Sequence, residues 1–281
     1  MIAVLGTGLL GSGFARAALR RGEAVRVWNR TIDRARPLAD DGAIVCDDPA
    51  ATIRDATRVH VVLSDDAAVD DVLAAAEPGR GALILDHTTT STAGARRRTA
   101  AWRERGITYV HAPVFMGPAN ALASTGLMLL SGDREVVAAV TPLLAPMTGQ
   151  VVDLGSRVDA AAAFKLLGNL LLMAITGGFA DMLALGKSMG VAPTEVAALL
   201  SSFNPGATLP ARLQRMIDMP WDDPSWELAM ARKDARLIEG ELEGSGLPLA
   251  VIPGIAARMD AMIADGHGKS DWTVIAKAAL S

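Results

Sequence analysis

The sequence contains a single cysteine, Cys46, among its 281 residues. One cysteine can form neither an intrachain disulfide nor a Cys-x-x-Cys metal or redox pair, so a disulfide framework is excluded and a reducing compartment is indicated. The four histidines, at positions 60, 87, 111 and 267, lack the spacing of metal ligands. We therefore expect no metal catalysis.

The sequence also lacks a large excess of charge of either sign. The chain has 27 Lys and Arg against 31 Asp and Glu, for a net charge of −4, and both signs are mixed along its length. No basic face for nucleic acid and no charged tail is visible. The first residues, MIAVL, already suggest a strand, which leaves no room for a signal sequence. We expect a cytoplasmic protein with a small-molecule ligand, bound to neither nucleic acid nor membrane.

Short apolar runs alternate with longer alanine-rich segments over the first half of the chain. With 51% hydrophobic and 21% charged residues, a chain of this length can form two well-packed domains. Strands that alternate with helices predict a largely parallel sheet covered on both faces. The expected strands are residues 1–5, 24–28, 58–63, 82–86, 107–110, 128–132 and 150–154.

After about residue 155 the strand signal stops and helices are expected. We therefore predict two domains, 1–155 and 156–281, joined by a long helix. Further helices are expected at 193–202, 226–243 and 253–264, with loops containing NPGATLP and MPWDDPSW between them.

The joining helix begins with AAAAFKLLGNLLLMAITGGFA, residues 160–180, in which Lys165 is the only charge. About 20 apolar residues would span a bilayer, but Lys165, Asn169 and the glycines at 168 and 177–178 interrupt this run. We predict a buried helix of a soluble protein. The lysine either has a function there or only lays its stem along apolar surface, with its ammonium in water.

The first expected strand ends in GTGLLG, residues 6–11, ahead of an apolar helix. In this strand–helix context, glycines permit a tight turn and let the backbone approach a pyrophosphate at the helix N-terminus. We predict a dinucleotide site at Gly6, Gly8, Leu9, Leu10 and Gly11.

The second expected strand ends in WNRT, without the carboxylate that would hold a ribose 2′-hydroxyl of NAD. Asn29, Arg30 and Thr31 offer hydrogen-bond donors and one fixed positive charge, which suit a 2′-phosphate. NADP is therefore expected rather than NAD. The alternative is that Arg30 only caps a solvated loop.

Several ordered motifs give the chain a resemblance to the β-hydroxyacid dehydrogenases, which include 3-hydroxyisobutyrate dehydrogenase and have the imine reductases as relatives. The motifs are GTGLLGSGFARAALRRG at the start, DHTTTS at 86–91, HAPVFMGPANALASTGLMLLSGD at 111–133, FKLLGN at 164–169, ARKDAR at 231–236 and DWTVIAKAAL at the end. The resemblance implies a Rossmann-like α/β N-terminal domain and an all-α C-terminal domain.

The resemblance also implies that Lys165 is the general acid/base. An ammonium on an apolar helix is poorly solvated, so its pKa should fall toward the working range. Asn169 lies one helical turn further on and would orient the lysine or hold the substrate oxygen.

The remaining cofactor contacts follow from the same resemblance. Leu63, Ser64, Asp65 and Thr89 would line the cofactor cleft at strand ends, and Lys233 would close over the nicotinamide side. For Ser64 and Asp65, ordinary loop roles are the alternative.

The expected substrate loop departs from the family pattern, since HAPVFMG stands where Asp-Ala-Pro-Val-Ser-Gly-Gly is usual. His111 replaces the acid, and Phe115 and Met116 replace the serine and a glycine. The glycine-rich stretch usual before the lysine is also absent. Val114, Phe115, Met116 and Gly117 are thus expected to form a more apolar substrate site, unless the two large side chains turn into the core.

We therefore predict an NADP-dependent reductase of a small carbonyl compound, or a dehydrogenase of the matching hydroxy acid or alcohol. An imine reductase and a non-catalytic NADP-binding sensor are the alternatives. The alanine- and leucine-rich helices after residue 155 favour a homodimer or higher homo-oligomer through that domain.

Overall fold

The apolar runs of the N-terminal half assemble into a six-stranded, all-parallel sheet in the computed structural model, which describes residues 1–218 and 221–280. The strand order is β3-β2-β1-β4-β5-β6, which reverses between β1 and β4. Ligands of such sheets bind beside this reversal, at the carboxyl ends of the strands. The strands are β1 (Ile2–Leu5), β2 (Val25–Trp28), β3 (Ile44–Val45), β4 (Val59–Val61), β5 (Leu83–Asp86) and β6 (Thr108–His111).

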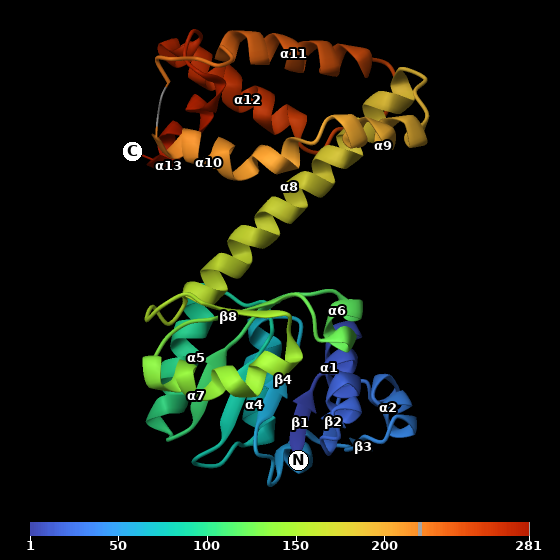
Figure 1. Cartoon of the computed structure of the whole chain (residues 1–281), viewed down its shortest axis with the longest axis vertical. Helices are drawn as coiled ribbons and strands as arrows, with labels where there is room; N and C mark the ends of the chain where they lie inside the picture. The colour runs from blue at the N-terminus through green and yellow to red at the C-terminus, as the bar shows by residue number, and fades with distance from the viewer. Residues whose placement is uncertain (219–220, 281) are drawn as a thin grey trace. The chain divides into compact units, whose positions relative to one another are not determined.

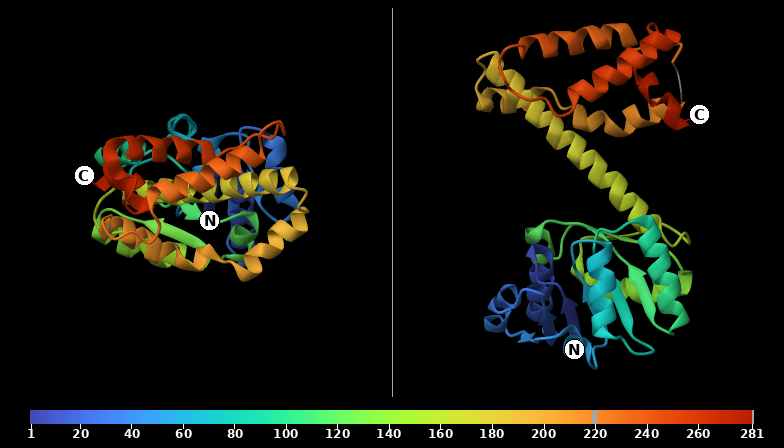
Figure 2. Two further views of the ribbon diagram at one scale, coloured as in Figure 1. Left: turned by 90° about the horizontal axis from the view of Figure 1, so that it is seen from above. Right: turned by 180° about the vertical axis from the view of Figure 1, so that it is seen from behind.

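Helices cover both faces of this sheet, as predicted (Figures 1 and 2). Alternate residues of β1 point to opposite faces: Val4 packs with Ala15 of α1 (Leu9–Arg20), whereas Leu5 packs with Leu73 of α4 (Asp66–Ala76). This two-sided burial explains why the strands are almost continuously apolar. The other helices of this region are α2 (Pro37–Asp40), α3 (Pro49–Ile53), α5 (Thr92–Glu104), α6 (Pro118–Ala123) and α7 (Arg134–Leu144).

A second, smaller sheet contains two strands that we expected in the main sheet, β8 (Leu127–Leu130) and β9 (Gln150–Asp153), and one strand that we did not expect, β7 (Val114–Phe115). In this sheet β7 is antiparallel to β8. The prediction of one sheet was therefore wrong. Pro113, which follows β6, has no N–H to continue the ladder, so the chain leaves the first sheet there and pairs anew from Val114.

The helix predicted from residue 160 extends over Ala160–Ser188 (α8). The chain divides within it into two compact units, Met1–Asn169 and Leu170–Ser281. The domain boundary that we placed at residue 155 lies ahead of this helix and stays a prediction.

The prediction that α8 is buried was wrong for a single chain, because only 6% of its most apolar stretch is buried. By its length and composition alone, α8 could cross a membrane. Core helices of soluble proteins can have the same length and composition, so this is weak evidence for a membrane span. Several of its large apolar side chains, such as Leu167 and Met173, stay mostly exposed in a single chain, which sequence periodicity cannot reveal. The cytoplasmic location stays a prediction.

The second unit is mostly helical, as predicted. Its core joins Leu228, Met259 and Val274, and the buried carboxylate of Asp271 accepts hydrogen bonds from Ser225 and Thr273. We expect a loop that contains NPGATLP, residues 204–210, but helix α10 already begins at Leu209 within this motif, directly after a short 3-10 helix, Pro205–Thr208. The other expected loop begins at residues 219–220, outside the described residues. The helices are α9 (Pro193–Ser202), α10 (Leu209–Asp218), α11 (Leu228–Glu241), α12 (Ile252–Met262) and α13 (Lys277–Leu280).

Candidate cofactor and catalytic site

Two glycines of the loop after β1 are required by the fold itself. Gly6 has φ +98°, and a Cβ there would lie 2.2 Å from the carbonyl oxygen of Val62. A Cβ on Gly11 would lie 2.0 Å from the carbonyl oxygen of Gly6. Any side chain at either position displaces backbone, so the fold needs glycine here to shape the turn and pack the helix, and contact of these two residues with a cofactor stays a prediction.

Gly8, in contrast, faces open space, since a Cβ there would meet no protein atom within 4 Å. It is the N-cap of α1, and no side chain caps this helix end. The first amides of α1 are thus available to an anion. Gly8, Leu9 and Leu10 line a cavity of about 680 Å³. These residues fit the pyrophosphate of a dinucleotide.

The end of β2 forms the next part of the cavity wall. The Asn29 amide is used internally: its Oδ1 accepts from the Thr7 N–H at 3.0 Å, and its Nδ2 donates to the Thr31 carbonyl at 2.9 Å. Asn29 therefore ties the glycine loop to β2. Arg30 and Thr31 also line the cavity, and their contact with a cofactor stays a prediction.

Arg34 lines the same cavity and was missed from the sequence. Within residues 1–218 and 221–280, neither Arg30 nor Arg34 forms an ion pair. A 3-10 helix, Ile32–Arg34, follows Arg30 and ends with Arg34, and both arginines line the one cavity. The spacing of two arginines four residues apart was the signal available, but only the structure shows that both reach one cavity.

The opposite wall contains Leu63, Ser64 and Thr89, as predicted, and also Thr88, whose Oγ1 accepts from the Leu63 N–H at 3.0 Å. Asp65 instead caps α4, because its carboxylate accepts from the Ala68 N–H at 2.9 Å. Its cofactor role stays a prediction. The other lining residues, none of them predicted, are Trp28, Pro49, Val62, Ala68, Asp71, Val72, Ala75 and His87.

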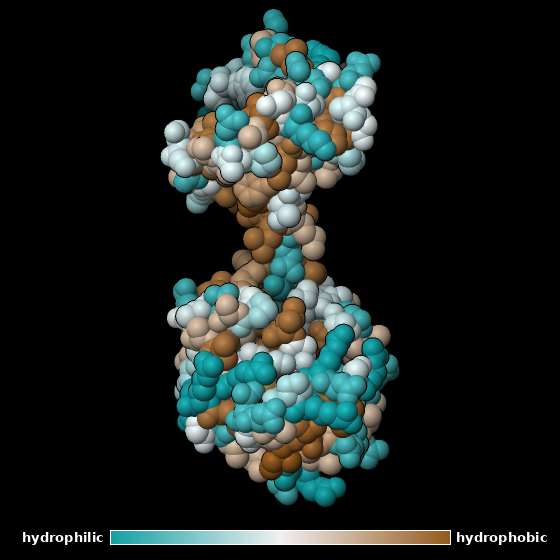
Figure 3. Space-filling view, turned by 90° about the vertical axis from the view of Figure 1, so that its right-hand side faces the viewer, coloured by the Kyte–Doolittle hydropathy of each residue, from teal (hydrophilic) through white to brown (hydrophobic). Residues whose placement is uncertain are grey.

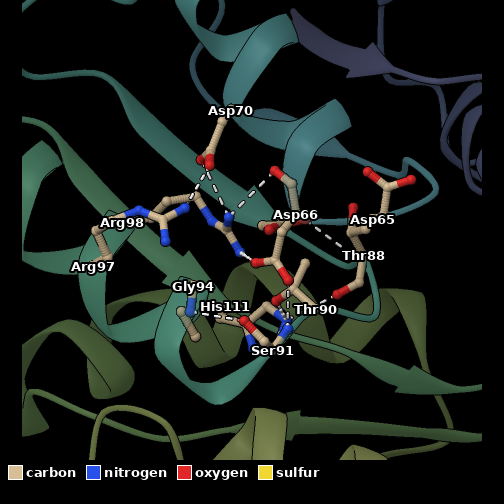
Figure 4. Close-up of polar contacts among 12 residues, drawn as sticks. Asp65, Asp66, Asp70, Thr88, Thr90, Ser91, Gly94, Arg97, Arg98 and His111 are labelled. Carbon is tan, nitrogen blue, oxygen red and sulfur yellow. Dashed lines mark hydrogen bonds and ion pairs between the residues drawn. The ribbon is translucent and has the colours of Figure 1, made fainter.

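A polar network holds the 87–91 segment in place, and Figure 4 labels its members Asp66, Ser91 and Arg98. Asp86 accepts from the Thr88 N–H at 2.9 Å and from the Tyr109 hydroxyl, to which Arg98 Nε donates at 2.9 Å. Arg98 also donates to Asp66 at 2.6 Å, and Asp66 accepts from the Ser91 N–H at 2.8 Å. Burial raises the pKa of Tyr109 well above its usual value, so its hydroxyl stays protonated and donates.

Two buried histidines, the cavity-lining His87 and His60, are linked in one series of hydrogen bonds. His87 Nδ1 lies 2.8 Å from the Ala112 carbonyl, which can only accept, so Nδ1 carries the proton. His87 Nε2 then accepts from His60 Nδ1 at 3.0 Å, and His60 Nε2 accepts from Arg58 Nε at 3.1 Å. Burial lowers the pKa of His87 to about 4 and that of His60 well below its usual value, so both are neutral.

The predicted catalytic and substrate residues meet at the start of α8. The Lys165 Nζ lies 4.2 Å from the centroid of the Phe115 ring, and burial lowers the pKa of the lysine. The Asn169 amide makes no hydrogen bond to any described residue. The lining of the 680 Å³ cavity includes neither Lys165 nor Phe115.

The rest of the predicted substrate segment serves packing. Val114 is buried in the core shared with α1 and α7, and Met116 packs against the same core. The Gly117 N–H donates to Asn120 at 3.0 Å at the start of α6. In the second unit, Lys233 pairs with Asp234 at 2.9 Å. Contacts of these residues with a ligand stay predictions.

The fold and the cavity define the class: a Rossmann-like, dinucleotide-binding domain followed by a mostly helical unit. Residues 1–155 match the NAD binding domain of 6-phosphogluconate dehydrogenase, and the chain belongs to this family. The resemblance to 3-hydroxyisobutyrate dehydrogenase-like enzymes and imine reductases is confirmed.

Two curated relatives and one solved structure illustrate the similarity. The 3-sulfolactaldehyde reductase of Escherichia coli is 26% identical over 290 residues, 98% of this chain and 94% of the relative. A probable 3-hydroxyisobutyrate dehydrogenase of Mycobacterium bovis is 28% identical over 194 residues, 68% and 65% of the two chains. The reductive aminase of Aspergillus terreus, in complex with NADPH and ethyl levulinate, has a TM-score of 0.90 at 26% identity, covering 99% and 98%.

These findings confirm that the protein is an enzyme, an NAD(P)-dependent oxidoreductase that acts on a small molecule. They remove the non-catalytic sensor from the alternatives.

Proposed function

We propose that the protein is an NADPH-dependent reductase of a small carbonyl compound, with Lys165 as the general acid/base. The observation that carries this proposal is the half-buried Lys165 ammonium at the start of α8, whose pKa burial lowers. Consumption of NADPH, followed against panels of aldehydes, ketones, keto acids and cyclic imines, tests it. Consumption with imines alone would contradict the carbonyl assignment.

The preference for NADPH rests on the charges around the end of β2. Arg30 and Arg34 share a cavity wall without an ion-pair partner among the described residues, and Thr31 adds a hydroxyl. A 2′-phosphate would supply the missing anion, and two guanidinium groups bind phosphate through charge-assisted hydrogen bonds. The relative with a TM-score of 0.90 also binds NADPH, which supports this choice.

The reaction requires one hydride and one proton. The nicotinamide, when bound, supplies the hydride to the carbonyl carbon. The Lys165 ammonium gives its proton to the carbonyl oxygen, and the neutral amine takes it back from the alcohol in the reverse reaction. Burial lowers the pKa of Lys165 from its ordinary value, which makes the neutral amine easier to reach in the reverse reaction.

The substrate is proposed to be less polar than a short hydroxy acid. Phe115 replaces the serine whose hydroxyl would bind a carboxylate, and its ring lies against the lysine. Met116 packs against the core, so the apolar change at the site comes from Phe115 alone. An alkyl arm gains about 0.8 kcal/mol for each buried methylene. The ratio of kcat/KM for apolar aldehydes and short β-hydroxy acids measures this preference.

Imine reduction is the second candidate, because the reductive aminase covers 99% of this chain. The two reactions differ in their need for a proton, since an iminium carbon takes hydride without protonation of an oxygen. Lys165→Ala therefore separates them: carbonyl reduction should fall, whereas reduction of a preformed iminium should persist.

A homodimer is proposed from the apolar surface of α8 (Figure 3), where Leu167, Leu170 and Met173 are 60%, 65% and 70% exposed. So many exposed large apolar side chains on one helix mark an interaction surface, and a second copy of the chain offers the same surface in return. Light scattering should give a dimer that Met173→Glu dissociates. Ile44→Glu, at an exposed apolar position on β3, should leave it intact. A monomeric wild type would contradict the proposal.

A further inference from the structure

The ring of Phe115 and the ammonium of Lys165 form a cation–π pair. The Nζ lies 4.2 Å from the ring centroid, well inside the range in which an aromatic face attracts a cation. Among the described residues, no carboxylate pairs with Lys165. The Phe115 ring, which β7 supplies, is thus the group that faces the Lys165 ammonium.

Gly168 is what allows the ring to lie there. A Cβ at this position would approach the Phe115 ring atoms Cζ at 2.2 Å and Cε1 at 2.6 Å. Positions 165 and 168 lie three residues apart and share one face of α8. The ring tip therefore fits directly against the helix backbone at Gly168 and lies beside the lysine.

We propose that Phe115 is the positioning residue of the catalytic lysine, and that Gly168 is its matched partner on α8. The ring holds the Lys165 ammonium on its face and keeps it protonated, as a proton donor for reduction. This inference rests on the proposed acid/base role of Lys165. It gives the serine-to-phenylalanine change a role in catalysis as well as in substrate choice.

Two opposing effects act on the lysine. Burial disfavours the ammonium and lowers its pKa, whereas the ring face stabilises the charge. The carboxylate near the start of α8 is already paired: Asp159 forms ion pairs with Arg96 of α5 and with Arg157 at 3.2 Å. In the segment before β7, His111 is buried with a lowered pKa. A substitution of Phe115 should therefore change the pKa of Lys165 through loss of the aromatic ring.

The first test measures the protonation of Lys165 without turnover. Reductive methylation of this lysine, followed by peptide mass spectrometry from pH 6 to 11, gives the midpoint at which the amine becomes reactive. Phe115→Leu keeps apolar bulk but removes the π face, so the midpoint should fall by about 0.5 to 1 pH unit. Phe115→Met provides a second variant of the same kind. An unchanged or higher midpoint in the folded variants would overturn the proposal, since greater hydration alone raises it.

The second test measures the fit of the ring against α8. Gly168→Ala should lower the midpoint of thermal unfolding by about 3 °C or more in the wild type, but not in a Phe115→Ala background, where alanine favours the helix. Gly178→Ala is the matched control, because a Cβ there meets nothing within 4 Å. An equal loss in both backgrounds would contradict the pairing.

The two proposals fail in different ways. If Lys165→Ala kept its turnover, the acid/base role would be wrong whatever the methylation midpoint. If the midpoint did not respond to Phe115→Leu, the positioning role would be wrong while the reductase assignment remained.

Discussion

The cofactor cavity and helix α8 differ in how far a single chain buries their apolar side chains and pairs their polar groups. Around the cavity, apolar strand residues are buried, and Asn29, Asp86 and His87 use their polar atoms in internal hydrogen bonds. On α8, Leu170 and Met173 remain exposed, and Lys165 has a ring instead of a carboxylate beside it.

The difference separates binding from chemistry. A wall whose Asn29, Asp86 and His87 are fixed by internal hydrogen bonds suits a cofactor whose shape is fixed, because these groups need no rearrangement on binding. A charge on a poorly solvated helix face suits proton transfer, since its pKa can be adjusted by what covers it. Changes around the cavity should thus alter affinity and stability, and changes on α8 should alter turnover.

Lys165→Ala should give the largest difference between an effect on turnover and an effect on cofactor binding. General acid/base catalysis contributes about 10²- to 10⁴-fold, so turnover of a carbonyl substrate should fall by that factor while NADPH still binds. Lys165→Arg should not restore it, because a guanidinium does not release its proton near neutral pH. Single-turnover kinetics and cofactor fluorescence measure the two effects.

Lys187→Ala, at the other lysine of α8, is the matched control and should leave turnover unchanged. Retention of more than about a tenth of wild-type turnover in Lys165→Ala, with chemistry limiting the rate, would contradict the acid/base role.

Acid should weaken the cavity wall through its histidines. Burial holds the pKa of His87 at about 4 against 6.5 in an unfolded chain, so the unfolded chain binds protons first as the pH falls. The stability from this histidine is complete above pH 6.5 and is lost between 6.5 and about 4, in total about 3 kcal/mol. Hydrogen exchange of the β4 and β5 amides, corrected for intrinsic rates, measures this loss.

His87→Asn should flatten this pH dependence, and His267→Gln, in the second unit, should not. Amide protection in β4 and β5 that is the same at pH 7 and pH 4.5 would show that the two histidines are not held neutral.

Arg34→Ala should weaken NADPH binding by about 10- to 100-fold, since a charge-assisted hydrogen bond contributes about 1.5 to 3 kcal/mol. Arg30→Ala should act similarly, and NADH binding should change little in either variant. Arg36→Ala is the control, because Arg36 pairs with Asp33 at 2.5 Å. Equal losses for both nucleotides would contradict a 2′-phosphate site.

Gly8→Ala should have the smallest effect of the four. A Cβ there touches no protein atom, so the midpoint of thermal unfolding should be unchanged, while NADPH affinity falls by about tenfold, or about 1.4 kcal/mol. Gly6→Ala should instead destabilise the fold, because its Cβ meets the Val62 carbonyl at 2.2 Å. Unchanged NADPH affinity in Gly8→Ala would contradict the pyrophosphate site.

Much of the fold was predictable because its signals are local. The glycine pattern at residues 6–11 and the strands that alternate with helices follow from periodicity and turn chemistry, and α9 begins at Pro193 as predicted. Helix α10 was missed because NPGATLP marks a turn, and a turn can lead directly into a helix. The second sheet was missed because pairing of β8 with β9 depends on contacts between distant segments.

The candidate site shows the same limit. Sequence pointed to Arg30 and Lys165, because a charge at a strand end or within an apolar helix stands out locally. It did not point to Arg34 or His87, because neither the spacing of the two arginines nor the position of His87 after a strand shows which side chains reach the cavity.

The sequence by itself determined the class of fold, the dinucleotide loop and the isolated charge of α8, since each depends on neighbours along the chain. Only the tertiary structure decided that Phe115 lies against Gly168 and under Lys165, 50 residues away from the lysine in sequence. It also decided that the apolar face of α8 is exposed. The physical reason is that packing joins segments whose separation along the chain leaves no pattern to read, whereas turns and helices are set within a few residues.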